Sequence, residues 1–210
     1  TGASGGHIYP ALNFLEAFLK KEITSEALLV LPKRNALGNP ADIPAEVRYL
    51  SIVTVTQKIN LRNLFAVWNF MKGCMESLFI LVGFRPDIVV GFGSLASIPI
   101  VLYAWLFRIP TMIHEQNVIP GRATRLLSKF ADRIAVSFEE SGYYFSRYKR
   151  KLVLTGNPVR PRLRRMEKGE GLAYFGLRQN KFTVLVMGGS QGSQTINTHF
   201  VRSLSVWKSS

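Results

Sequence analysis

The chain has 210 residues, of which 47% are hydrophobic, and it carries a formal net charge of +14. This composition supports a packed core and excludes a mainly disordered chain. The single cysteine, Cys74, excludes an intramolecular disulfide framework and fits a reducing, cytosolic setting. The positive charge indicates an affinity for phosphates, which nucleotides, nucleic acids and anionic lipid headgroups all carry.

Short apolar runs alternate with segments of helical periodicity along the chain. In chain order the pattern predicts a helix at 10–21, strands at 27–31 and 48–52, a helix at 61–82, a strand at 87–91, a helix at 98–107, a strand at 110–113, a helix at 121–130, a strand at 133–137, a helix at 139–148, strands at 151–155 and 182–187, and a helix at 194–204. This alternation is typical of an α/β fold in which a parallel sheet has helices on both faces.

The alternation is interrupted after residues 156–158, where a basic, loop-like segment begins and continues to about 181. We therefore expect a first domain of residues 1–160. Residues 161–210 are expected to hold a linker and the first strand–helix unit of a second domain. The chain opens directly on a glycine loop, which normally follows a buried strand, and it ends soon after another strand and loop. This predicts a fragment truncated at both ends, with a first domain complete apart from its first strand.

Three glycine-rich loops lie at strand ends or ahead of helices, at residues 2–7, 91–94 and 188–192. Glycine lets the backbone approach a ligand closely, and a helix that begins behind such a loop offers free amides and a partial positive charge to a phosphate. None of the loops has the spacing of the dinucleotide fingerprint or the Walker loop. Glycine also serves structural needs in strand-to-helix turns, so the three loops together carry more weight than any one.

The densest polar cluster is His114-Glu115-Gln116-Asn117, which directly follows the apolar run at 109–113. In open parallel sheets, ligands bind beyond the carboxyl ends of the strands, where such loops lie. Imidazole, carboxylate and amide groups in one loop indicate a polar ligand. A solvated turn is the plainer alternative.

Three side chains are candidates for a direct chemical role. His7 lies at the mouth of the first glycine loop, where an imidazole could take a proton from an attacking hydroxyl. Glu115 is a second candidate base, and it could equally hold a substrate hydroxyl or orient a neighbour. Arg160 could reach a phosphate from the domain boundary. The alternatives are a structural histidine and an ordinary surface arginine.

The predicted helix at 61–82 is apolar around too much of its circumference for a single buried face. Bulky apolar residues beside basic ones are typical of a helix that lies in a membrane interface, although part of this helix must pack on the sheet. The residues concerned are Leu64, Phe65, Trp68, Met71, Lys72 and Met75. The uncharged run at 88–107 is long enough for a membrane span, but glycine, serine and proline interrupt it, and we interpret it as a buried strand and a buried helix.

Together these motifs resemble those of the MurG family, the peripheral membrane glycosyltransferases that complete lipid II for peptidoglycan. The resemblance covers nearly the whole chain. It rests on five motifs whose order and approximate spacing match the family: Ser4-Gly5-Gly6-His7 with Pro10, Gly91-Phe92-Gly93, Ile113-His114-Glu115-Gln116-Asn117 with Gly121, Gly156-Asn157-Pro158-Val159-Arg160, and Gly188-Gly189-Ser190-Gln191-Gly192. The third and fifth are the most specific.

The resemblance implies a GT-B architecture, with two Rossmann-like domains facing each other across a cleft. The N-terminal domain would receive undecaprenyl-linked lipid I, and the C-terminal domain would hold most of the UDP-N-acetylglucosamine. The implied reaction is an inverting transfer of N-acetylglucosamine to the muramoyl 4-hydroxyl, at an anionic membrane surface on the cytoplasmic face of the bacterial cell membrane. No cofactor or metal is implied, since such enzymes stabilise the departing UDP with backbone amides and a helix dipole.

The resemblance also implies roles for single residues. His7 matches a proposed base or acceptor-orienting residue, ahead of Glu115. Positions that match donor contacts are Ser4, Gly5, Gly6, Asn117, Arg160 and Ser190, and positions in the family's apolar, basic-rimmed membrane patch include Trp68, Met71 and Trp105. The sequence departs from the family at Ser4, where Thr is common, and at Ser94-Leu95, where Gly-Tyr is common, a change that bears on acceptor contacts.

Three alternatives remain on the sequence alone. One is a GT-B transferase with a different sugar or acceptor. Another is a non-catalytic subunit that recruits an acceptor at the membrane, although such a subunit has no need of the strand and loop at 182–192. The third is nucleic-acid binding, but the chain has no RNP, zinc-finger or helix-turn-helix pattern, so we expect no nucleic-acid partner. Because later C-terminal motifs of the family are absent from these residues, we expect the fragment itself to be inactive.

Overall fold

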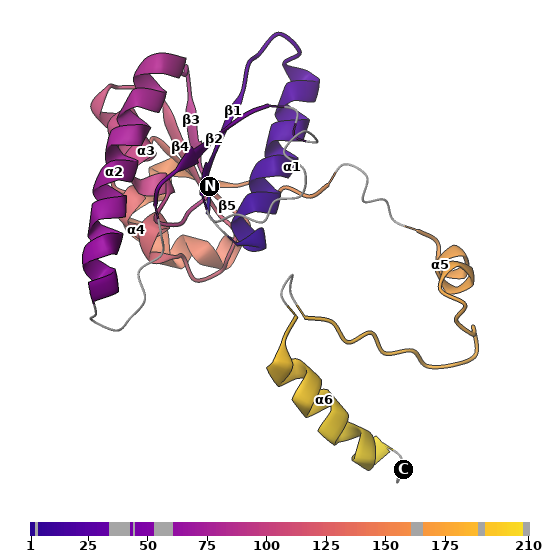
Figure 1. Ribbon diagram of the computed structural model, residues 1–210. Helices are drawn as coiled ribbons and strands as arrows, with labels where there is room; N and C mark the ends of the chain where they lie inside the picture. Colours follow the sequence, from indigo (N-terminus) through magenta and orange to yellow (C-terminus); the bar gives the residue numbers. More distant parts are fainter. Residues whose placement is uncertain are drawn as a thin grey trace. The chain divides into compact units, whose positions relative to one another are not determined.

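The computed structural model describes residues 1–2, 4–33, 43, 45–52, 61–160, 166–188 and 192–207, without the side chains of 61–64 and 205–207. The chain divides into two compact units, Thr1–Pro161 and Arg162–Ser210. The first contains α1 (Gly5–Lys21), β1 (Leu28–Pro32), β2 (Glu46–Leu50), α2 (Leu61–Phe84), β3 (Val89–Gly91), α3 (Ser97–Leu106), β4 (Thr111–Glu115), α4 (Arg122–Leu127), β5 (Arg133–Val136), η2 (Glu139–Lys151) and β6 (Leu152–Leu154), and the second contains α5 (Lys168–Tyr174) and α6 (Gln194–Trp207) (Figure 1).

The described strands form two parallel sheets, in the orders β1-β2 and β3-β4-β5-β6. Gly91 of β3 pairs with Ile113 of β4, and His114 of β4 pairs with Ala135 of β5. Because paired parallel strands point the same way, the carboxyl ends of β3 to β6 lie along one edge. The polar loop after β4 therefore lies between the loops that follow β3 and β5. The expected α/β architecture of parallel strands and covering helices is confirmed.

The sheet β1-β2 has a helix on each face, because successive side chains of β1 point to opposite sides. Leu29 and Leu31 pack against α1, whereas Leu28 and Val30 pack in a separate cluster with Ile80 of α2. Figure 1 shows α1 and α2 on opposite sides of these strands. This arrangement places the amino-terminal turn of α1 close to the loop after β3.

The largest core covers one face of the four-stranded sheet. It is formed by buried side chains from β3, β4 and β5, from α2, α3, α4 and η2, and from the turn between α4 and β5: Leu81, Val89, Val101, Ala104, Ile113, Leu127, Ala131, Ile134, Val136 and Phe145. Each fully buried aliphatic or aromatic side chain contributes about 1.5–3 kcal/mol relative to exposure. This packing holds the strand ends, and hence the loops beyond them, in fixed positions.

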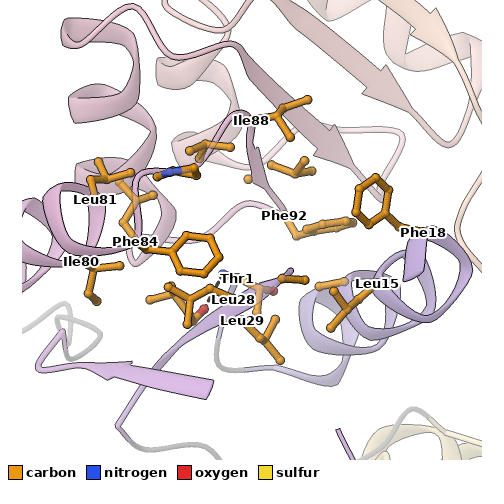
Figure 2. A pocket seen from close by; sticks show the side chains of 18 of the residues that line it. Thr1, Leu15, Phe18, Leu28, Leu29, Ile80, Leu81, Phe84, Ile88 and Phe92 are labelled. Atoms are coloured by element: carbon orange, nitrogen blue, oxygen red, sulfur yellow. Dashed lines mark hydrogen bonds between the residues drawn. The ribbon is translucent and has the colours of Figure 1, made fainter. Parts of the chain in front are cut away.

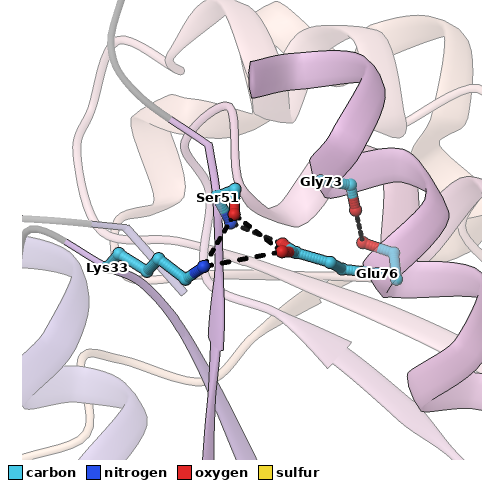
Figure 3. A network of polar contacts seen from close by, with 5 residues as sticks. Lys33, Ser51, Gly73 and Glu76 are labelled. Atoms are coloured by element: carbon cyan, nitrogen blue, oxygen red, sulfur yellow. Dashed lines mark hydrogen bonds and ion pairs between the residues drawn. The ribbon is translucent and has the colours of Figure 1, made fainter. Parts of the chain in front are cut away.

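A polar network fastens α2 to the ends of β1 and β2 (Figure 3). Glu76 accepts hydrogen bonds of 2.6 Å from both the backbone N–H and the hydroxyl of Ser51, and Lys33 Nζ lies 3.6 Å from Glu76 Oε1. Burial acts to raise the pKa of the Glu76 carboxyl, but the Ser51 hydrogen bonds and the charges of Lys33 and Lys72 outweigh it and lower that pKa. Glu76 therefore stays ionised and ties the helix to the sheet.

A cavity of about 620 Å³ lies between β1 and β3, the end strands of the two sheets (Figure 2). Its walls are mainly apolar and include Leu28, Ile80 and Phe92. The backbone nitrogen of Thr1 lies 3.0 Å from the carbonyl oxygen of Val30. Residues 114–117 do not line the cavity, so the polar site is separate from it.

The segment predicted as a helix at 139–148 forms the 3-10 turns of η2 instead, with non-helical backbone angles at Phe145 and Tyr148. Tertiary contacts account for the difference. The hydroxyl of Ser141 donates to the carbonyl of Asn117, and Phe145 is buried in the main core. These contacts override the helical preference of the segment.

The second unit also differs from prediction. The expected strand at 182–187 is not a strand, and Phe182 is 96% exposed. The described part of this unit contains no strand that could pair with it, and an apolar run becomes a strand only when a neighbour accepts and donates its backbone hydrogen bonds. In addition, α5 lies within the segment at 159–181 that was expected to be a loop.

Candidate functional site

The amino-terminal turn of α1 and the polar loop after β4 meet at one edge of the four-stranded sheet. His7 Nδ1 and Gln116 Oε1 lie 3.0 Å apart, although the two residues are 109 positions apart in the sequence. The loop after β3 adjoins them, since the rings of Phe92 and His114 are 5.5 Å apart. Three loops that the sequence pattern singled out separately are thus brought together.

The imidazole of His7 is held between two glycines. A Cβ on Gly2 would lie 2.8 Å from His7 Cδ2, and a Cβ on Gly93 would lie 3.2 Å from His7 Cε1. Gly93 also has a φ of +78°, which disfavours any side chain at this position. Both glycines are therefore needed for the ring to occupy its place, a role that the glycine pattern did not reveal.

Gln116 connects the two histidines of the site. Its Nε2 lies 3.1 Å from the carbonyl oxygen of His114 and 3.4 Å from that of Phe92. The same nitrogen lies 3.2 Å from His114 Nδ1, while the oxygen of the amide faces His7. The sequence placed Gln116 in a polar cluster but gave no sign that it bridges two residues, because its partner lies in a distant part of the chain.

His114 is buried and makes contacts at both ring nitrogens. Its Nε2 lies 3.1 Å from the carbonyl oxygen of Gly156, which begins the segment leading out of the first unit. Burial lowers the pKa of the imidazole, against the opposing effects of the Gly156 carbonyl and the Glu115 carboxylate. A neutral, enclosed imidazole of this kind is suited to positioning its neighbours.

Glu115 organises the loop that follows it. Its side chain is 1% exposed. Its Oε1 accepts hydrogen bonds from the backbone N–H of Asn117 at 3.0 Å and from Asn117 Nδ2 at 3.1 Å, and its Oε2 accepts one from the backbone N–H of Gly121 at 3.1 Å. Three donors thus converge on one carboxylate. This geometry favours a positioning role for Glu115 over that of a base.

The amino terminus of α1 lies in the same region as His7. Ser4 is the N-cap residue with an extended backbone, but its side chain makes no capping hydrogen bond, and the first turn has no acidic residue. The first amides of the helix, which include those of Gly5 and Gly6, have no intrahelical partner, and the helix dipole favours an anion beside them. Asn117 is exposed at the end of the polar loop.

Arg160 lies at the end of the first unit. Its guanidinium is 5.0 Å from the centre of the Tyr9 ring of α1. The connecting segment is also held by Asn13, whose Nδ2 donates a 2.9 Å hydrogen bond to the carbonyl of Pro158. Arg160 is therefore drawn toward the amino-terminal half of α1, the helix that carries His7. Ser190, the remaining donor-site candidate, lies outside the described residues.

Metal-binding side chains do not gather in the described part of the chain. No group of three or more His, Cys, Asp or Glu residues there could hold a metal ion. The groups described above are two imidazoles, a carboxylate, two side-chain amides and the amino terminus of a helix. These groups can accept a proton, orient a hydroxyl and bind an anion.

A separate apolar surface runs along α2 and the end of α3, two helices that pack together. The exposed apolar residues are Phe65, Val67, Trp68, Met71, Met75, Phe79, Val82, Trp105, Leu106 and Phe107, and Lys72 is exposed among them. The predicted positions with described side chains thus lie at the surface, while the side chain of Leu64 lies outside the described residues. Phe79, Val82, Leu106 and Phe107 extend this surface beyond the predicted set.

Helix α2 also contains Phe65–Phe84, which among the described residues has the length and mean hydropathy, 1.3, of a helix able to cross a membrane. However, Ile80 and Leu81 of the same helix are buried in the protein cores. A helix that covers a sheet with one side meets the same length and hydropathy criteria. The burial of one side supports a surface helix with its other side exposed.

Comparison with known proteins identifies the family. The model of the glycosyltransferase family 28 N-terminal domain matches residues 1–136. The chain belongs to glycosyltransferase family 28. The match includes α1, β1 to β5 and the polar residues 114–117 at the end of β4 and in the loop after it, so the site described above lies almost entirely within the family 28 domain.

Two relatives of this family 28 chain are both named UDP-N-acetylglucosamine--N-acetylmuramyl-(pentapeptide) pyrophosphoryl-undecaprenol N-acetylglucosamine transferase. One from Thermoanaerobacter sp. is 40% identical over 206 residues, covering 97% of this chain and 56% of the relative. One from Desulforamulus reducens is 38% identical over 207 residues, covering 97% and 55%. The chain thus spans about half the length of these relatives.

The fold comparison agrees. A crystal structure of MurG from Acinetobacter baumannii aligns with a TM-score of 0.58 at 22% identity, covering 77% of this chain and 45% of that one. This likeness supports the GT-B type of α/β fold. The resemblance to the MurG family that the motifs indicated is confirmed by the names of the relatives.

Proposed function

We propose that a protein containing this chain transfers N-acetylglucosamine from UDP-N-acetylglucosamine to the muramoyl 4-hydroxyl of lipid I, forming lipid II. The observation that carries the proposal is the position of His7, which is held by Gly2 and Gly93 at the amino terminus of α1 and contacts the polar loop through Gln116. The name that the relatives share supports the substrate pair.

In the proposed reaction, His7 accepts the proton of the acceptor hydroxyl as that oxygen attacks the anomeric carbon of the donor sugar. The bond from this carbon to the UDP oxygen breaks on the opposite face, so the configuration inverts. A positioned base of this kind typically accelerates a reaction by about 10²- to 10⁴-fold. His7 suits the task because its ring is fixed from both sides.

The proposed donor side uses the amino terminus of α1. Negative charge develops on the UDP diphosphate as the sugar leaves, and unpaired helix amides stabilise such charge without needing a metal. Ser4, Gly5 and Gly6 lie at this turn, and Arg160 is held over Tyr9 of the same helix. We include Asn117, Arg160 and Ser190 among the donor contacts, with Glu115 holding the loop from which Asn117 projects.

We further propose that the apolar surface of α2 and α3 contacts an anionic membrane at the cytoplasmic face of the cell membrane. The name of the relatives includes a pyrophosphoryl-undecaprenol acceptor. Undecaprenol is a long hydrocarbon chain, so such an acceptor resides in a membrane. Trp68, Phe79 and Trp105 supply apolar contact area, and Lys72 supplies a positive charge beside them. Apolar side chains with nearby basic groups are suited to an interfacial position.

Vesicle binding tests the membrane proposal. We expect the protein to sediment with vesicles that contain anionic phospholipid. The double variant Trp68→Ser/Phe79→Ser should bind about tenfold more weakly or worse, because burying each large apolar side chain contributes about 1.5–3 kcal/mol to the free energy of binding. Tyr143→Ser is the matched control, since Tyr143 is an exposed aromatic residue on η2. Equal binding by all three proteins would contradict a membrane role for this surface.

A turnover assay tests the reaction. Full-length protein that contains these residues should release UDP from UDP-N-acetylglucosamine only when a lipid I analogue is present. Other UDP-sugars should give much slower release, which separates this reaction from that of a different GT-B transferase. The 210 residues alone should give no turnover. Efficient transfer of a different sugar would contradict the proposal, and turnover by the 210-residue chain would contradict its inactivity.

A further inference from the structure

Only one orientation of the Gln116 side-chain amide fits the groups around it. The carbonyl oxygens of His114 and Phe92 lie 3.1 Å and 3.4 Å from one end of its amide. A carbonyl oxygen only accepts hydrogen bonds, so the end of the amide that faces both must be the NH2 group. The other end, which lies 3.0 Å from His7 Nδ1, must then be the oxygen.

A second set of contacts leads to the same orientation. His114 Nε2 faces the carbonyl oxygen of Gly156 at 3.1 Å, so this nitrogen carries a hydrogen. In a neutral imidazole the other nitrogen then has a lone pair. His114 Nδ1 therefore accepts from Gln116 Nε2 at 3.2 Å. Three carbonyl oxygens of the backbone thus determine where the hydrogens lie in the whole cluster.

We propose that Gln116 is a positioning residue that fixes the tautomer of His7, with the hydrogen on Nδ1 and the lone pair on Nε2. The amide oxygen of Gln116 accepts from His7 Nδ1–H and gives no donor to it. Because one nitrogen of a neutral imidazole donates and the other accepts, this contact leaves Nε2 as the basic atom. Nε2 lies in the ring between Cδ2 and Cε1, the two carbons that face Gly2 and Gly93.

This inference concerns the state of His7, and its catalytic consequence rests on the proposed function. A histidine base works only when its lone pair faces the hydroxyl that it deprotonates. The tautomer set by Gln116 assigns that role to Nε2. Loss of the Gln116 oxygen would leave the ring in place between its glycines but with the hydrogen free to move to the other nitrogen. Turnover would then fall with little change in substrate binding.

Nitrogen NMR on the histidine-labelled 210-residue chain, at a pH where His7 is neutral, tests the tautomer directly. The ring nitrogen shifts should show His7 with Nδ1 protonated in the wild type. In Gln116→Met, which keeps the length of the side chain but removes the acceptor, His7 should change to the Nε2–H form that free neutral histidine prefers. Ser141→Ala is the control, since it removes a hydrogen bond to the carbonyl of Asn117 in the same loop and does not touch His7.

The outcomes separate clearly. An Nε2–H form in the wild type, an Nδ1–H form retained in Gln116→Met, or the same change in Ser141→Ala would each overturn the inference. In full-length protein, Gln116→Met should lower kcat by about tenfold to a hundredfold with KM within a fewfold of wild type. If the NMR result is as expected but kcat is unchanged, the tautomer assignment stands and the role of His7 as the base in the proposed function fails.

Discussion

Replacing Glu115 with Gln should loosen the polar loop by a predictable amount. The carboxylate accepts three hydrogen bonds, two from Asn117 and one from the backbone of Gly121. Hydrogen bonds to a charged group contribute about 1.5–3 kcal/mol each, and neutral ones about 1 kcal/mol. Gln retains one acceptor oxygen and sets an NH2 group against the remaining donor. Relief from burying a charge offsets part of the loss, so we expect a net cost of about 2 kcal/mol.

Amide hydrogen exchange measures this cost locally. A change of about 2 kcal/mol corresponds to exchange about 30-fold faster at the backbone amides of Asn117 and Gly121. Glu139→Gln is the matched control, because Glu139 is an exposed carboxylate on η2. Wild-type exchange at both amides in Glu115→Gln would refute the positioning role. It would also return Glu115 to consideration as a base.

Two further predictions concern stability. Burial lowers the pKa of His114, so the free energy of unfolding should fall as the pH drops below about 6.5, the ordinary pKa of an imidazole. Urea titrations across this range should show a smaller slope in His114→Gln. Gly93→Ala should lower the free energy of unfolding in urea by about 1–3 kcal/mol, because residue 93 has a φ of +78° and a Cβ there would press against His7. Gly121→Ala should lower it far less, because a Cβ at residue 121 would meet nothing within 4 Å.

The sequence pattern located the site more reliably than it assigned the roles within it. The apolar run at 109–113 followed by polar residues correctly indicated a strand near its carboxyl end. The strand continues two residues further than predicted, so His114 and Glu115 belong to β4 and only Gln116 and Asn117 lie in the loop. The pairing of His7 with Gln116 could not be predicted, because contacts between residues 109 positions apart depend on how α1 packs against the sheet. The glycine loops were interpreted as phosphate-binding elements, but Gly2 and Gly93 also make room for an imidazole.

The predicted strands formed wherever a neighbouring strand was available to pair with them. Strands β1 to β5 coincide closely with the apolar runs, since each pairs with a neighbour and packs under a helix. The run at 182–187 has the same composition as a buried strand, but no described strand of its unit lies beside it. The composition of a segment indicates whether it can be buried, but whether it becomes a strand depends on the other strands of the sheet.

The most direct test of the account is the turnover of full-length protein in which His7 is replaced by Gln. The account predicts that kcat falls about 10²- to 10⁴-fold, while UDP-N-acetylglucosamine binds within a fewfold of wild type and the thermal unfolding temperature changes little. A variant that keeps wild-type kcat would contradict the claim that the imidazole between Gly2 and Gly93 is the base of the reaction.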